Sequence, residues 1–176
     1  MSAPTLVDQK AQPKTVALFV SDLHLSAQMP KTAAAFFRFL NEDALTTHQL
    51  YLLGDIFEYW AGDDDIDEPF NRKVIDALRA LTNKGVALYW MAGNRDFLVG
   101  DAFAQATGMR LLPDPYIADI GGQRMLLVHG DAQCTDDKDL HGISFASTQS
   151  CMAKRLPRQA ARRAKDDYPR HARRQP

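Results

Sequence analysis

The chain contains four short, continuous runs of apolar and β-branched residues, separated by longer segments with a different pattern. The runs cover residues 16–20, 50–53, 86–91 and 125–128. Each run is too short for a typical helix, and none alternates apolar with polar positions as a strand with one wet face does. The pattern therefore predicts four strands that are buried on both faces.

The segments between these runs carry apolar residues at the spacing of an amphipathic helix. Residues 31–45, 69–83 and 101–107 are the predicted helices. Pro69 suits the first turn of a helix, while Gly85 and Gly108 suit the positions just after a helix C-terminus. The resulting order β-α-β-α-β-α-β predicts a layered α/β fold.

The hydrophobic pattern fades after about residue 137, and the charge changes with it. Residues 1–150 carry 12 Lys and Arg against 20 Asp and Glu, whereas residues 151–176 carry 9 against 2. The last segment has almost no large apolar side chains with which to offset its ordering entropy. We therefore expect a flexible N-terminus over residues 1–14, a folded domain over residues 15–137 and a divergent, disordered basic tail over residues 138–176.

Composition excludes several classes of protein. No apolar stretch approaches the roughly 18 residues of a membrane span, and the polar start lacks the apolar run of a signal peptide. The two cysteines, Cys134 and Cys151, match no paired-cysteine metal site. The expectation is a cytosolic protein with reduced thiols.

Each predicted strand runs directly into a polar cluster. The clusters contain Asp22 and His24, then Asp55, then Asn94 and Arg95, and finally His129. Because ligands bind at the carboxyl ends of the strands in open α/β sheets, we expect these residues to meet in one crevice. Carboxylate, imidazole and amide groups without thiolate suit a pair of divalent transition metals.

Local spacing supports this hypothesis. The two-residue separation of Asp22 and His24 places both side chains on one side of an extended segment, and Gly54 allows a tight turn before Asp55. Two cations would lower the pKa of a shared water and hold a phosphoryl group during in-line attack. Arg95 adds a planar cation suited to phosphate oxygens.

The order D-x-H, G-D, G-N-[HR]-D, H-G-D over residues 16–131 resembles the signature of the calcineurin-like metallophosphoesterases. The stretches SDLHLS, LGDIFEYWAGDDD, AGNRDFLVG and VHGDAQCTDD are similar to the UDP-2,3-diacylglucosamine hydrolases (diphosphatases) of lipid A biosynthesis. The resemblance implies a layered β-sandwich flanked by helices, with its C-terminal part incomplete here. It also implies two Mn²⁺ ions: Asp22 and His24 on one, Asp55 bridging, Asn94 and His129 on the other.

The same resemblance implies a substrate and a place in the cell. Asn94 and Arg95 would contact the substrate phosphates, and Asp137 the glucosamine part of the lipid. The reaction would be hydrolysis of the pyrophosphate of UDP-2,3-diacylglucosamine to UMP and 2,3-diacylglucosamine 1-phosphate, by water attack at the α-phosphorus. The partners would be this lipid-linked nucleotide and the cytoplasmic face of the inner membrane, where the enzyme sits peripherally.

The chain departs from the family after about residue 137. The family's late G-H-x-H motif gives one histidine to each metal, but the last histidines here, His141 and His171, form no such pair. We therefore interpret the chain as truncated or frameshifted, with weakened metal sites, weak or no hydrolase activity and an aggregation-prone open sheet edge.

Other interpretations stay open. The acidic run at residues 63–68 is a solvated surface or substrate loop, or alternatively a third metal site, and Trp60 is expected to pack in the core or a loop. The basic tail could bind nucleic acid or anionic lipid, but the acidic body would repel nucleic acid, so no such partner is expected. The alternative functions are hydrolysis of another nucleotide or phosphodiester, and an inactive fragment.

Overall fold

The computed structural model describes residues 15–130, and within them the chain forms one parallel sheet, one hairpin and three helices. The elements are β1 (Thr15–Val20), α1 (Pro30–Asn41), β2 (Thr47–Leu53), α2 (Pro69–Asn83), β3 (Ala87–Met91), α3 (Asp101–Thr107), β4 (Arg110–Leu112), β5 (Tyr116–Ile120) and β6 (Gln123–Leu127). Two single 3₁₀ turns, η1 (Ala44–Thr46) and η2 (Asp63–Asp65), lie in the connections. The predicted α/β class is confirmed.

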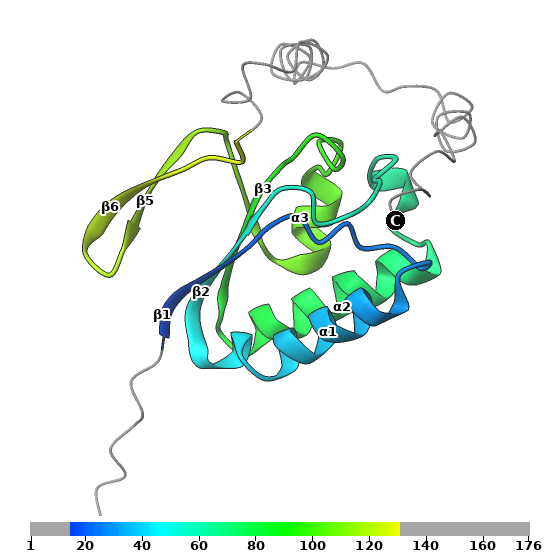
Figure 1. The fold of residues 1–176 in the computed structure, drawn as a ribbon, viewed down its shortest axis with the longest axis horizontal. Helices are drawn as coiled ribbons and strands as arrows, with labels where there is room; N and C mark the ends of the chain where they lie inside the picture. The colour runs from blue at the N-terminus through cyan, green and yellow to red at the C-terminus, as the bar shows by residue number, and fades with distance from the viewer. Residues whose placement is uncertain (1–14, 131–176) are drawn as a thin grey trace, which may run out of the picture.

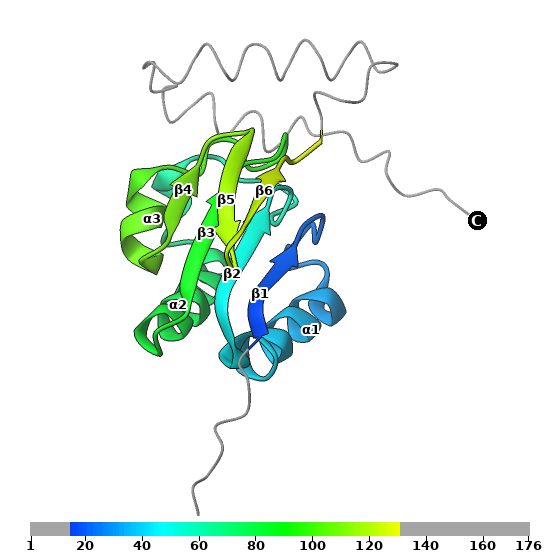
Figure 2. The same ribbon diagram turned by 90° about the vertical axis from the view of Figure 1, so that its left-hand side faces the viewer.

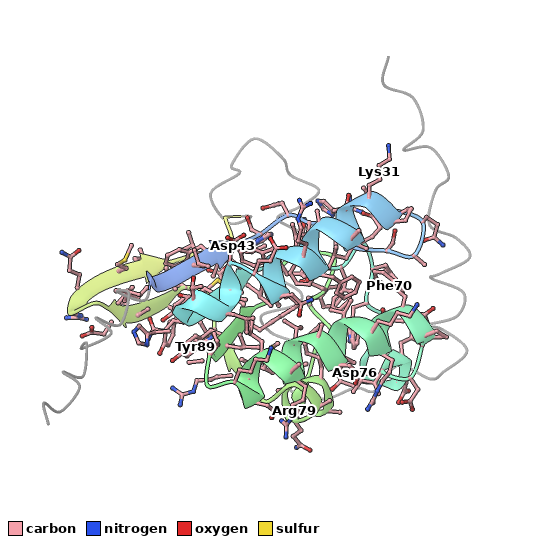
Figure 3. The ribbon with its side chains drawn as sticks, turned by 90° about the horizontal axis from the view of Figure 1, so that it is seen from below. Lys31, Asp43, Phe70, Asp76, Arg79 and Tyr89 are labelled. Atoms are coloured by element: carbon pink, nitrogen blue, oxygen red, sulfur yellow. The ribbon has the colours of Figure 1, made fainter. Side chains whose placement is uncertain are left out.

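The four-stranded sheet has the order β1-β2-β3-β4, and every neighbouring pair is parallel. The connecting helices lie on one face of the sheet (Figure 1). Seen from that side, α1 and α2 run next to each other, and Lys31 and Arg79 project outward from them (Figure 3). Buried side chains of both helices and of the central strands, among them Phe36, Leu78 and Trp90, form the main core.

The hairpin β5–β6 lies on the opposite side of the sheet from the helices (Figures 1 and 2). A second apolar cluster fills the space between them: Tyr51, Met91 and Leu112 from the parallel sheet contact Ala118, Ile120 and Leu127 of the hairpin. Burial there raises the pKa of the Tyr51 phenol to about 12. The layers are thus helices, sheet and hairpin.

Several helix boundaries follow the sequence pattern. Pro69 occupies the first turn of α2, and Glu68 caps this helix by accepting hydrogen bonds from the backbone N–H groups of Phe70 and Asn71. Gly108 ends α3 with a left-handed backbone, as only glycine adopts without strain. The first helix is shorter than predicted: it stops at Asn41, and η1 follows.

The fourth predicted strand is present, but the prediction that it is buried on both faces is wrong. Residues 125–128 were expected to be buried on both faces, but β6 pairs antiparallel with β5, and Leu126 is 66% exposed. The physical reason is the Gly121-Gly122 turn, which folds β6 back on β5 and leaves one face of the pair open. The short strand β4 was not predicted.

Part of the predicted domain organisation cannot be compared. The expected flexible start at residues 1–14, the end of the predicted domain at 131–137 and the expected basic tail at 138–176 lie outside the described residues. Among the helices that are described, none combines the length and the apolar character needed to cross a bilayer.

Candidate metal centre

The loops that follow β1 and β2 run side by side beyond the ends of these strands. The backbone N–H groups of Asp22, His24 and Leu25 donate to the carbonyls of Gly54, Asp55 and Ile56 at 3.1, 3.0 and 2.7 Å. A parallel bridge between Leu25 and Phe57 continues the pairing. These hydrogen bonds hold the two loops in a fixed relation at the carboxyl edge of the sheet.

Three residues of these loops have a left-handed backbone. The φ angles of Asp22, His24 and Asp55 are 54°, 50° and 53°, a conformation that is uncommon for residues other than glycine. The expected extended segment from Asp22 to His24 is therefore wrong. Such strain persists only where the surrounding structure imposes it, and it is concentrated at functional sites.

The turns bring the three side chains together. One ligand atom from each of Asp22, His24 and Asp55 lies within 4.8 Å of the others. The Asp55 side chain is 8% exposed, whereas Asp22 lies at the surface. A buried carboxylate beside a more open one can hold a cation on one side and leave it accessible from the other.

His129 joins the group from the end of β6. Its Nε2 lies 3.9 Å from Asp55 Oδ1, while its Nδ1 lies 2.8 Å from the carbonyl oxygen of Leu53. A carbonyl only accepts, so Nδ1 carries a proton, and Nε2 is the ring nitrogen that faces Asp55. Two ligand atoms that each lie about 2.1 Å from one ion are roughly 3–4 Å apart, which this pair matches.

Two glycines make these approaches possible. A Cβ on Gly54 would collide with the His129 ring, and a Cβ on Gly93 would collide with the carboxylate and the backbone nitrogen of Asp55. Gly54 also has a φ of 86°. The expected tight turn before Asp55 is confirmed, and the contact of His129 with Gly54 gives a second reason for glycine there.

The loop after β3 approaches Asp55 from another direction. The backbone N–H of Arg95 donates to Asp55 Oδ1 at 3.0 Å. Asn94 lies between this residue and Gly93, and both of these neighbours adjoin the Asp55 carboxylate. The structure thus brings the loops that carry the predicted residues Asp22, His24, Asp55, Asn94, Arg95 and His129 to one edge of the sheet. Predicted residue Asp137 lies outside the described residues.

Asp96, the aspartate of the G-N-[HR]-D motif, is a residue to which the strand-end argument assigned no role. Its side chain is fully buried, and it accepts hydrogen bonds from the backbone N–H groups of Gly93, Asp55 and Ile56 at 2.8, 3.3 and 2.8 Å. Burial raises the pKa of the Asp96 carboxyl, backbone donors lower it, and the nearby Asp55 raises it further. Through its hydrogen bonds, the single Asp96 side chain ties the loop after β3 to the loop after β2.

Glu58 was also missed. One of its oxygens, Oε1, lies 2.8 Å from Arg95 Nη1, and the other, Oε2, lies 3.4 Å from His24 Nδ1. No local signal marks this residue in the sequence, because its partners are 34 and 37 positions away along the chain. Glu58 contacts one predicted metal ligand and one predicted phosphate-binding residue.

The acidic run at residues 63–68 is not simply a solvated loop. The Asp63 carboxylate accepts from the backbone N–H groups of Gly100, Ala102 and Phe103 at 3.0, 2.8 and 3.2 Å. Asp63 therefore caps α3 from a distant part of the chain, whereas Glu68 caps α2 from the position directly before that helix. Asp67 stays at the surface. Trp60 is 1% exposed, which confirms its expected place in the core.

Comparison with known proteins finds similar sequences. Residues 16–167 match the family described as calcineurin-like phosphoesterase. A UDP-2,3-diacylglucosamine hydrolase of Serratia proteamaculans is 52% identical over 121 residues, which are 69% of this chain and 50% of that protein. Another, of Aromatoleum aromaticum, is 52% identical over 129 residues, 73% of this chain and 51% of that protein.

The chain thus spans about half the length of the curated relatives that it matches. A solved structure, that of Pseudomonas putida nuclease MPE, is similar over 58% of this chain and 49% of that chain, with 25% identity and a TM-score of 0.42. The structural likeness is too low to support a functional argument.

Proposed function

This chain belongs to the calcineurin-like phosphoesterase family, and we propose on that basis that it is a hydrolase with a dinuclear metal centre at the carboxyl edge of its sheet. The observation that carries the proposal is the convergence of Asp22, His24 and Asp55 within 4.8 Å. The proposed ligands are Asp22 and His24 for one ion, Asp55 as the bridge, and Asn94 and His129 for the other.

The donor set fits divalent transition metals. It consists of carboxylate and amide oxygens and imidazole nitrogens without thiolate, which suits Mn²⁺ among other ions. The His129 tautomer is already the one that a metal ligand needs, because Leu53 holds its Nδ1 proton. When bound, such ions supply Lewis acidity and lower the pKa of a bound water.

The other residues of the edge are proposed to bind the substrate. Arg95 offers a guanidinium and Asn94 an amide, on a loop whose Arg95 backbone N–H donates to the Asp55 carboxylate. A guanidinium fixed by Glu58 is oriented before substrate arrives, so less entropy is lost on binding a phosphate. Asp137 is proposed to contact the sugar part of the substrate.

The proposed substrate follows the name of the relatives. We propose hydrolysis of the pyrophosphate of UDP-2,3-diacylglucosamine to UMP and 2,3-diacylglucosamine 1-phosphate. A substrate with acyl chains is held at a membrane surface, so the proposed location is peripheral, on the cytoplasmic face of the inner membrane. Cleavage of another nucleotide or phosphodiester is the competing proposal, and a chain without hydrolase activity is the third outcome.

The test measures metal binding and turnover on the whole 176-residue chain. We expect Mn²⁺ to bind, Asp55→Asn to weaken binding of both ions because one bridge serves both, and turnover of the lipid diphosphate to be weak and Mn²⁺-dependent. A chain that binds no Mn²⁺ would overturn the proposed function. Faster turnover of a nucleotide diester than of the lipid diphosphate would favour the competing substrate.

A further inference from the structure

Glu58 lies between the candidate metal centre and the arginine proposed to bind phosphate. Its Oε1 accepts from Arg95 Nη1 at 2.8 Å, and its Oε2 faces His24 Nδ1 at 3.4 Å. The three side chains are between 32% and 34% exposed. Ion pairs with this exposure add little to stability, so orientation of the two partners is the larger effect to consider.

The nitrogen that faces Glu58 has no other partner in the described part of the chain. The His24 Nδ1 atom is buried and makes no hydrogen bond with any described residue. A buried polar atom without a hydrogen bond lowers the stability of the folded protein. A small rotation of either side chain would let Glu58 Oε2 form a hydrogen bond with His24 Nδ1. Because a carboxylate only accepts, this hydrogen bond forms only if Nδ1 carries the proton.

We propose that Glu58 is a positioning residue that acts on both partners at once. It holds the proton of neutral His24 on Nδ1, which leaves the Nε2 lone pair for a cation, and its other oxygen fixes Arg95 for a phosphate. Leu53 performs the first task for His129, through its carbonyl oxygen at 2.8 Å. The inference rests on the proposed function, and it identifies Glu58 as the residue that links metal binding to phosphate binding.

The chemistry of Glu58→Gln makes the proposal testable. An amide has one oxygen and one NH₂ group, so a glutamine at this position can accept from Arg95 or from His24, but not from both. The oxygen stays with Arg95, because this contact is the shorter of the two and a guanidinium only donates. The NH₂ group then donates to His24 Nδ1 and moves the imidazole proton to Nε2. Glu42→Gln is the matched control, since it makes the same change at an exposed position at the end of α1.

The first measurement is the ¹⁵N NMR signature of the imidazoles in the cation-free chain, with His24 assigned by His24→Gln. We expect the Nδ1-protonated form of His24 in the wild type and a shift to the Nε2-protonated form in Glu58→Gln. His129 and the Glu42→Gln control should not change. A wild-type His24 that carries its proton on Nε2, or a tautomer that Glu58→Gln leaves unchanged, overturns the inference.

The second measurement is Mn²⁺ affinity by calorimetry. We expect Glu58→Gln to weaken binding about tenfold, as loss of a hydrogen-bonded partner of a metal-binding histidine does, without lowering the unfolding temperature of the cation-free protein. A lowered unfolding temperature with unchanged Mn²⁺ affinity would mean a merely structural role. Asp22→Asn separates the two proposals: if it leaves Mn²⁺ binding intact, the proposed function fails, and the NMR result still decides on Glu58.

Discussion

At the scale of single residues, the candidate centre depends on backbone conformations that most sequences avoid. Asp22, His24 and Asp55 all have a positive φ, which costs about 1–2 kcal/mol for a residue with a Cβ and less for aspartate and histidine. Gly54 and Gly93 leave room for the His129 ring and the Asp55 carboxylate. Site geometry is therefore obtained at some expense in stability.

Gly54→Ala tests the close approach. Both Gly54 and Gly85 have a positive φ, but a Cβ at Gly85 would meet open space, whereas one at Gly54 would meet the His129 ring. We expect both variants to lose about 1 kcal/mol of stability from backbone strain. Gly54→Ala should in addition weaken Mn²⁺ binding by tenfold or more in calorimetry, since His129 is displaced. Equal Mn²⁺ affinities in the two variants would contradict the proposed role of His129.

At the scale of elements, the start of α3 is held by a carboxylate from another part of the chain. Asp63 in η2 receives three backbone N–H groups at the start of α3, and this contact joins the loop after β2 to the loop after β3. Because Asp96 joins the same two loops nearer the centre, the carboxyl edge of the sheet is supported at two places.

Asp63→Ala tests this cap. We expect a loss of about 1–2 kcal/mol in the free energy of unfolding, which is typical for removal of an N-cap carboxylate, measured by urea denaturation. Asp67→Ala is the matched control in the same acidic run, because the Asp67 side chain is 90% exposed and its ion pair with Arg72 is long, at 3.7 Å. A control as destabilised as Asp63→Ala would show that the charge of the run matters and the cap does not.

At the scale of the whole molecule, the described part of the chain exposes apolar side chains on its hairpin. Ile117 and Leu126 face each other across β5 and β6 and are 53% and 66% exposed. Val16 and Phe19 of β1 are also exposed, at 45% and 42%, and β1 is an edge strand of the sheet. Open apolar edges of this kind favour association between molecules.

The expected result of replacing both Ile117 and Leu126 with lysine is weaker self-association in sedimentation velocity, with the fold retained because both side chains lie outside the two cores. Ala35→Lys together with Ala80→Lys is the control, since it adds the same charge at exposed helix positions. If the control lowers association equally, net charge and not the hairpin surface is responsible.

Local information in the sequence was enough to predict most of the regular elements and the types of residue that form the candidate site. Hydrophobic period identified the strands β1 to β3 and the three helices, and proline and glycine marked several of their ends, because these effects act within a few residues. The convergence of Asp22, His24 and Asp55 was also predictable, since parallel strands deliver their ends to one edge.

Tertiary structure alone decided how these residues meet. The left-handed turns at Asp22 and His24 are imposed by hydrogen bonds to the loop after β2, and Asp96 acts on backbone groups about 40 positions away. Glu58 and Asp63 likewise find their partners 34 or more positions along the chain. Such contacts form only once the sheet has assembled, so no periodicity or spacing in the sequence records them.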